Sequence, residues 1–337
     1  MRNFAYVLPD TVEAASREAL VEGARLKAGG VDLLDLMKAG IIAPDRLVNL
    51  GNLRAPGLRE VGVKDDGIHI GALVTLAQLA ATPALPDVLT AAAGKAATPQ
   101  IRNLATVGGN LAQRVRCWWF RSATFPCARK EGNQCYAQNG ENKYHAVFDN
   151  SDCAAVAPSS LSSPLVALDA TVVTSKRRIP IEQFFVPTTV DITKEQVLEP
   201  GEIITEVFVP KASQGWRNAY REAGERESQD WQLVSASVAL EMNGSGEGAT
   251  VKAGRIAMGG VAVVPYRMKA VEAALAGKPV TTATVAQAAE LGFTKATPFE
   301  ENAYKVPLGQ AVLRRAILAA AGLAAAGLGE AGTTGGR

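Results

Sequence analysis

The sequence is poor in histidine and cysteine and has no marked excess of charge. Its 337 residues include two histidines, His69 and His145, and four cysteines. Neither histidine belongs to a recognisable catalytic motif, so the sequence offers no convincing acid–base or nucleophile constellation for chemistry on a substrate. The 35 Lys and Arg residues balance 33 Asp and Glu residues and are scattered, so no electrostatic footprint for nucleic acid is present.

Long apolar runs and an export signal are also missing. No stretch reaches the roughly 18 uncharged apolar residues that predict a membrane span, and the N-terminal segment already carries Asp10 and Glu13. We therefore expect no membrane span and a cytoplasmic location. The small number of cysteines and the lack of an export signal make a disulfide scaffold the less expected use of the thiols.

The length and the pattern of the chain predict more than one domain, because 337 residues exceed one ordinary hydrophobic core. The N-terminal part alternates short strands and helices, with Thr11 as a helix N-cap. From about Trp216 onward, strands precede helices, which indicates a separate α+β domain with an antiparallel sheet. Between them, the apolar runs of residues 163–175 predict a buried strand and its lead-in.

Two paired-glycine loops stand at predicted strand–helix junctions. The first, RLKAGGVDLLDLMK, carries Gly29 and Gly30, and the second, TVGGN, carries Gly108 and Gly109. A helix start has unpaired N–H groups, and glycine lets an anion approach the backbone, so the two loops would suit a dinucleotide pyrophosphate. Neither has the full G-x-G-x-x-G spacing, and from the residues alone two structural turns remain the favoured interpretation.

All four cysteines lie in one segment directly after the second loop. They are separated by 9, 7 and 17 residues, which is neither the close pairing of zinc fingers nor a ferredoxin spacing. Four thiolates would suit a [4Fe–4S] cluster, a Cys3His zinc site with His145 is an alternative, and two disulfides or four unrelated thiols stay open. For a cluster, nearby basic residues would offset its charge and aromatic residues would exclude water; these are Arg116, Arg121, Arg129 and Lys130, with Trp118, Trp119 and Phe120.

Three stretches carry a family resemblance. AGGVDLLDLMK, QIRNLATVGGNLAQR and GGVAVVPYR resemble the FAD-binding (medium) subunit of the molybdenum hydroxylases, a family that includes xanthine dehydrogenases, carbon monoxide dehydrogenase and aldehyde oxidoreductases. The C-x9-C-x7-C insertion after the second loop, followed by GENKYHAVF and a fourth cysteine, resembles the bacterial periplasmic aldehyde oxidoreductase type. The medium subunit of that type carries FAD and a [4Fe–4S] cluster, so the resemblance favours the cluster over zinc or disulfides.

The resemblance implies an α+β fold in two domains. Residues 1–212 would form a PCMH-type (vanillyl-alcohol-oxidase-like) FAD-binding domain, with subdomains at about 1–55 and 56–212 and the cysteine loop 115–155 inserted. Residues 216–325 would form a C-terminal α+β domain of the carbon monoxide dehydrogenase flavoprotein type, in which an antiparallel sheet packs with helices. Residues 326–337 would be a tail.

The resemblance also implies two sets of site residues, with no catalytic residue in this chain. The cluster would be held by Cys117, Cys127, Cys135 and Cys153. The FAD would be held by residues of the two glycine loops and two further positions, namely Leu26, Lys27, Ala28, Gly29, Gly30, Val31, Asp32, Leu33, Leu34, Thr106, Gly109, Asn110, Ser160 and Ile204.

Three positions depart from the family pattern. Val31 stands where the family often has Thr, Ser160 stands where it usually has Asp, and Leu233 is the nearest match to an expected cofactor-contacting Lys. These changes remove side-chain contacts. The backbone cradle depends on main-chain N–H groups, so FAD binding is still expected.

The resemblance implies an electron-transfer subunit of a heterotrimer. A large partner with a molybdenum cofactor would oxidise the substrate, most plausibly an aldehyde to a carboxylic acid. A small partner with two [2Fe–2S] clusters would pass electrons to FAD here, and FAD would reduce an external acceptor. Alternatives are a xanthine or N-heteroaromatic dehydrogenase, a 4-hydroxybenzoyl-CoA reductase-like enzyme, or a freestanding flavin carrier or zinc-stapled protein. Co-export with a signal-bearing partner would make the location periplasmic.

Overall fold

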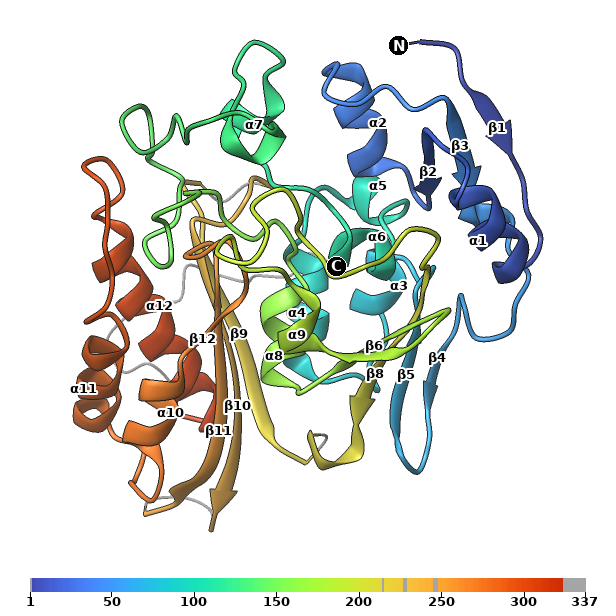
Figure 1. Ribbon diagram of the computed structural model, residues 1–337. Helices are drawn as coiled ribbons and strands as arrows, with labels where there is room; N and C mark the ends of the chain where they lie inside the picture. Colours follow the sequence, from blue (N-terminus) through green and yellow to red (C-terminus); the bar gives the residue numbers. More distant parts are fainter. Residues whose placement is uncertain (1, 214, 227–228, 245–247, 324–337) are drawn as a thin grey trace.

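The computed structural model describes residues 2–213, 215–226, 229–244 and 248–323, so the predicted tail lies outside the described residues. The chain folds into three sheets with helices around them (Figure 1). The strands are β1 (Ala5–Val7), β2 (Ala24–Lys27), β3 (Arg46–Asn49), β4 (Val61–Val63), β5 (Gly67–Gly71), β6 (Thr171–Thr174), β7 (Arg178–Pro180), β8 (Ile204–Pro210), β9 (Arg217–Ala223), β10 (Val234–Asn243), β11 (Thr250–Gly259) and β12 (Tyr266–Arg267). The helices are α1 (Val12–Ala19), α2 (Val31–Lys38), α3 (Leu76–Ala80), α4 (Asp87–Lys95), α5 (Pro99–Arg102), α6 (Val107–Leu111), α7 (Trp118–Arg121), α8 (Ser162–Ala167), α9 (Ile181–Phe184), α10 (Lys269–Leu275), α11 (Thr282–Gly292) and α12 (Lys305–Ala320).

The N-terminal sheet is small and parallel, with the strand order β1-β3-β2. Helix α1 connects β1 to β2 and begins at Thr11, whose side-chain oxygen accepts a hydrogen bond from the Ala14 N–H at 3.1 Å, as the sequence predicts. Helix α2 follows β2 directly. This arrangement brings the first glycine loop to the end of a parallel strand.

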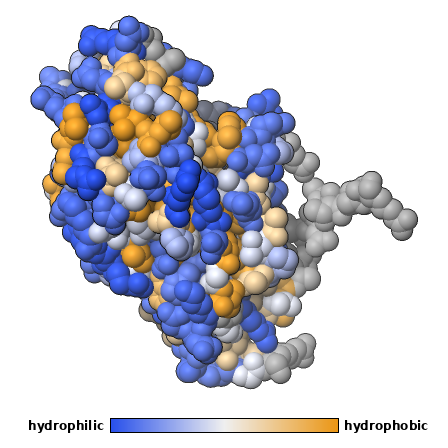
Figure 2. Space-filling model, turned by 90° about the vertical axis from the view of Figure 1, so that its right-hand side faces the viewer, coloured by the Kyte–Doolittle hydropathy of each residue, from blue (hydrophilic) through white to orange (hydrophobic). Residues whose placement is uncertain are grey.

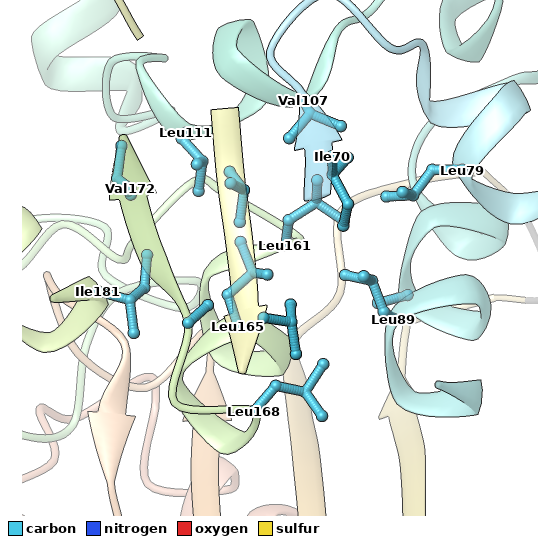
Figure 3. Packing of buried hydrophobic residues seen from close by; sticks show 14 of the residues in the cluster. Ile70, Leu79, Leu89, Val107, Leu111, Leu161, Leu165, Leu168, Val172 and Ile181 are labelled. Atoms are coloured by element: carbon cyan, nitrogen blue, oxygen red, sulfur yellow. The ribbon is translucent and has the colours of Figure 1, made fainter. Parts of the chain in front are cut away.

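The middle sheet is antiparallel in the order β4-β5-β8-β6-β7 and contains the main core of the first 212 residues. Its buried strand residues pack against α3, α4, α6 and α8, and Figure 3 shows Leu79, Leu89, Leu111 and Leu165 from these helices next to Ile70 and Val172 from the sheet. Burial of so many aliphatic side chains is the principal force that holds the layer together. The second glycine loop stands on this core.

The C-terminal sheet is antiparallel in the order β12-β11-β10-β9, and β10 is its most buried strand. Helices α10, α11 and α12 cover one face, and α4 and α8 contact the other (Figure 1). The α+β class, with an antiparallel sheet and helices at the C-terminal end, is therefore confirmed. The lead-in to β6 differs from the expected extended chain, because residues 162–167 form α8. Pro164 is tolerated there because it stands in the first turn of the helix.

The surface is mainly polar. Figure 2 shows hydrophilic residues over most of one face, interrupted by separate apolar patches. None of the helices in the described part of the chain is both long enough and apolar enough to cross a membrane.

Candidate functional site

The first glycine loop joins β2 to α2 and is packed against the chain that leads into the second loop. Gly30 is the N-cap of α2, and its φ of 79° lies in the left-handed region that glycine favours. Gly29 faces the backbone, because a Cβ there would lie 1.9 Å from the carbonyl oxygen of Leu104. The N-terminus of α2, whose first N–H groups have no partner within the helix, thus lies beside the second loop.

The second loop is the short helix α6, and its polar side chains order the loop itself. The Thr106 Oγ1 caps α6 by accepting a hydrogen bond from the Gly109 N–H at 3.1 Å. Asn110 is buried; its Nδ2 donates to Ser160 Oγ at 3.1 Å, and its Oδ1 accepts from Ser159 Oγ at 2.7 Å. The structure therefore brings together Thr106, Gly109, Asn110 and Ser160, four of the residues that the sequence assigns to the cofactor.

The remaining residues assigned to the cofactor differ in accessibility. Every residue from 26 to 34 is half-buried, so the first loop is within reach of a ligand. Lys27 is turned back on the loop, where its Nζ donates to the Ala28 carbonyl at 3.2 Å. Ile204 begins β8 and is 8% exposed within the core of the middle sheet. Its side chain is the least accessible of the set.

Asp32 points away from its own loop toward the segment before the first cysteine. Its carboxylate accepts from the Arg114 N–H at 2.9 Å and from Arg121 Nη2 at 2.6 Å, and it lies 3.1 Å from Arg116 Nη2. From the sequence, Asp32 is assigned to the cofactor, and Arg116 and Arg121 are assigned to the cysteines. The structure joins the two groups directly, which sequence spacing could not reveal because they lie more than 80 positions apart.

The four cysteines line one cavity. Cys117 precedes α7, Cys127 and Cys135 lie in the irregular chain after it, and Cys153 closes the segment. All four are free thiols, and the cavity that they line has a volume of about 20 Å³. In the part of the chain that the structure describes, no three His, Cys, Asp or Glu side chains converge closely enough to hold a single metal ion.

Of the four basic residues named from the sequence, only Arg129 lines the cavity. Arg129 is 4% exposed, lines the cavity and pairs with Glu195 at 3.1 Å. The thiol of Cys135 and the nearby guanidinium of Arg129 lower the pKa of Cys153, while the hydrogen bond between the two thiols raises the pKa of Cys135. The cavity therefore favours a thiolate at Cys153.

Aromatic residues form part of the cavity wall, and His145 contacts one of the thiols. Trp119 and Phe120 line the cavity, as the expectation of shielding requires. Trp118 packs instead edge-on against the ring of His145, with centroids 5.1 Å apart. The His145 Nε2 lies 3.2 Å from Cys117 Sγ, and burial lowers the pKa of this imidazole to about 4, so the ring is neutral. His145 thus contacts the first thiol through a hydrogen bond.

The C-terminal domain holds the chain around His145 in place. Asn302 donates from its Nδ2 to the carbonyls of His145 at 3.2 Å and Ala146 at 3.1 Å. Lys305 is 1% exposed, and its ammonium donates to the carbonyls of Tyr144, His145 and Gly260 at 2.8 to 3.0 Å. Sequence reasoning missed both residues, since a lysine and an asparagine at the start of a helix give no signal of such contacts.

We expect Lys305 to give the stability of the protein a pH dependence. Burial lowers its pKa from 10.5 to about 7. Between these values the unfolded chain binds more protons than the folded chain, so the free energy of unfolding should rise with pH, by up to about 1.4 kcal/mol per pH unit. Urea unfolding at several values in this window should show that rise in the wild type and its loss in Lys305→Met. Parallel pH profiles for the two proteins would contradict the assignment.

Two family models match most of the chain. One, described as the FAD binding domain in molybdopterin dehydrogenase, matches residues 2–212, and the other, described as the CO dehydrogenase flavoprotein C-terminal domain, matches residues 218–320. Together they cover both the glycine loops with the cysteine segment and the C-terminal sheet with its helices.

Individual proteins agree with these matches. The chain is 36% identical over 326 residues to the aldehyde oxidoreductase FAD-binding subunit PaoB of Escherichia coli, covering 93% of this chain and 96% of that protein. It is 27% identical to the carbon monoxide dehydrogenase medium chain of Hydrogenophaga pseudoflava, covering 88% of each. A solved chain of that organism's carbon monoxide dehydrogenase, in a form lacking the Mo-pyranopterin moiety, has a TM-score of 0.72 at 26% identity, covering 95% of this chain and 97% of that one.

Proposed function

We propose an electron-transfer function for this chain, because it belongs to the FAD-binding medium subunits of the molybdenum hydroxylases. The domain matches and the relatives show this membership. These subunits are parts of oxidoreductases. The proposal is that this chain carries FAD and a [4Fe–4S] cluster, and that it transfers electrons within an aldehyde oxidoreductase that converts aldehydes to carboxylic acids. It takes electrons from a small [2Fe–2S] subunit, and its own residues catalyse no bond change in the aldehyde.

One observation carries the proposal: four free thiols line a single cavity in a chain whose relative at 36% identity is an aldehyde oxidoreductase FAD-binding subunit. A zinc site needs four ligands within about 2.3 Å of one point. The four thiols line one cavity, whereas His145, the histidine that a Cys3His zinc site would use, is not among its lining residues and contacts only the Cys117 sulfur. This arrangement supports a multi-iron cluster held by Cys117, Cys127, Cys135 and Cys153.

The residues of the two loops suit the pyrophosphate of FAD. The half-buried stretch 26–34 ends in the N-terminus of α2, where unpaired N–H groups favour an anion. The absence of a side chain at Gly29 lets the two loops touch, and Asn110 orders the second loop against Ser160. Val31 and Ser160 each lack a polar group that is common in the family, so the cradle depends mainly on backbone N–H groups.

When bound, the flavin and the cluster supply reversible one- and two-electron chemistry. The chain's own residues hold the two groups, neutralise charge through Arg129, and exclude water with Trp119 and Phe120. Substrate oxidation then belongs to a large partner subunit with a molybdenum cofactor. An external electron acceptor would reoxidise the flavin held by the two glycine loops.

The test is to purify the chain with any partners and analyse its cofactors. We expect co-purification with two other chains, with one flavin and about eight irons per complex: four from the cluster of this chain and four from the two [2Fe–2S] clusters of the small subunit. The flavin absorption should bleach when an aldehyde is added without an acceptor. Stoichiometric zinc without flavin in a lone chain would overturn the proposal and favour a zinc-stapled module. Reduction by a purine or N-heteroaromatic compound, with no response to aldehydes, would contradict the aldehyde assignment alone.

A further inference from the structure

Helix α2, which follows the flavin loop, is fastened to the cysteine segment by a network of charged residues. Arg121 Nη2 lies 2.6 Å from Asp32 Oδ1, and Arg121 Nη1 lies 2.9 Å from Asp35 Oδ2. Arg116 bridges the same two carboxylates, at 3.1 Å each. Arg116 and Arg121, which lie on either side of Cys117, therefore both bind carboxylates of α2. Helix α2 is the helix that begins at the end of the first glycine loop.

The side chain of Arg121 is held by backbone carbonyls as well as by the carboxylates of α2. Arg121 Nε donates to the Val115 carbonyl at 2.9 Å, and its Nη2 donates to the Arg114 carbonyl at 3.0 Å. The Arg121 side chain is 12% exposed and that of Asp32 is 16% exposed, so solvent screens this pair less than an open surface pair. Arg121 therefore connects the backbone that precedes Cys117 to helix α2.

Apolar packing follows the same line. Leu36, one turn after Asp32 on α2, is 2% exposed and belongs to the cluster of buried side chains around the cysteine cavity. That cluster also contains Val115, Phe120, Cys127, Cys153, Ala155 and Val263. A displacement of the cavity wall would therefore also displace α2, because closely packed interiors transmit displacement.

We propose that Arg121 is a positioning residue that couples the two cofactor sites, so that a filled cysteine cavity strengthens retention of FAD, and bound FAD strengthens retention of iron. The inference rests on the proposed function. A cluster bound to all four thiols fixes the chain from Cys117 through α7, and Arg121 passes this constraint to the start of α2. Coupling between two sites is reciprocal and typically reaches fivefold or more.

The measurement compares FAD binding by the purified complex with and without its [4Fe–4S] cluster, which Cys153→Ser removes while leaving the [2Fe–2S] clusters of the small subunit in place. Equilibrium dialysis, read by flavin fluorescence, gives the FAD dissociation constant in each state. We expect cluster removal to weaken FAD binding by about fivefold or more in the wild-type background. In the Arg121→Gln background the ratio of the two constants should fall toward one. A purely electrostatic effect of the lost charge would weaken both states equally and leave the ratio unchanged.

Two further variants keep the test decisive. Asp35→Asn alters an exposed side chain and removes one carboxylate from the network, so it should lower the ratio even if Arg121→Gln does not fold. Arg255→Gln is the control, because Arg255 pairs with Asp169 and contacts neither α2 nor the cysteine segment through any ion pair. Equal FAD affinity with and without the cluster in the wild-type background, or an unchanged ratio in both network variants, would overturn the coupling. A complex without iron or without flavin would overturn the proposed function as well.

Discussion

Cys153→Ser is expected to remove about four irons per complex, those of the [4Fe–4S] cluster, together with the visible absorption of that cluster. Cys153 closes the cavity, and the nearby Arg129 guanidinium favours its thiolate form. A serine hydroxyl is a far weaker ligand for iron, and a cluster with three thiolates exposes one iron to exchange. Iron analysis and the visible spectrum measure the effect. By the coupling proposed above, the variant should also retain less flavin.

The matched control for this variant is His145→Gln. A glutamine amide can donate to Cys117 Sγ in place of the imidazole, so a [4Fe–4S] cluster held by four cysteines should persist. A Cys3His zinc site would instead lose its metal when His145 is replaced. Retention of the [4Fe–4S] iron in Cys153→Ser, or loss of metal in His145→Gln, would contradict the four-cysteine assignment.

Gly29→Ala is expected to abolish FAD binding and to destabilise the protein by about 1–3 kcal/mol. The added Cβ would lie 1.9 Å from the Leu104 carbonyl oxygen and 2.8 Å from its carbon, and backbone atoms cannot turn aside as a flexible side chain can. The two glycine loops must separate to admit the methyl group. Flavin content after gel filtration and the midpoint of thermal unfolding measure the two effects.

Gly94→Ala is the control for an added methyl group. Gly94 lies inside α4, and the nearest atom to its added Cβ would be the Ala80 Cβ at 3.8 Å, an ordinary contact. Alanine favours a helix over glycine by about 1 kcal/mol, so this variant should bind FAD normally and unfold at the same or a higher temperature. If Gly29→Ala kept its flavin as well as Gly94→Ala does, the loops would not form the cradle.

Local signals in the sequence were sufficient for most of the fold. Thr11 before an amphipathic run, paired glycines at the start of α2, and long alternating or apolar runs in the last third predict elements that the structure contains. The short apolar run 163–175 was harder, because periodicity does not separate a buried helical turn from a buried strand. There the chain forms α8 before β6, and packing against β10 and β11 decides between the two.

The sequence predicted which cysteines lie together but not the contacts between distant residues that support them. Cysteine number and order identified the thiols that share a cavity, since all four lie in one segment. Contacts between distant residues could not be predicted from the sequence: the carboxylate of Asp32, a residue assigned to the cofactor loop, also binds Arg121, 89 positions away. Lys305 reaches His145 over 160 positions. Such partners are set by the packing of the sheets, which residue spacing does not encode.

The contacts of Asn302 and Lys305 also set an order of events during synthesis. The ribosome adds Lys305 160 residues after His145, an interval of roughly 10 to 30 s at ordinary elongation rates. During that time the four thiols have been made, but the C-terminal support of their segment has not. The cysteines are therefore most open to oxidation and to wrong pairing until α12 has been made and has packed against their segment.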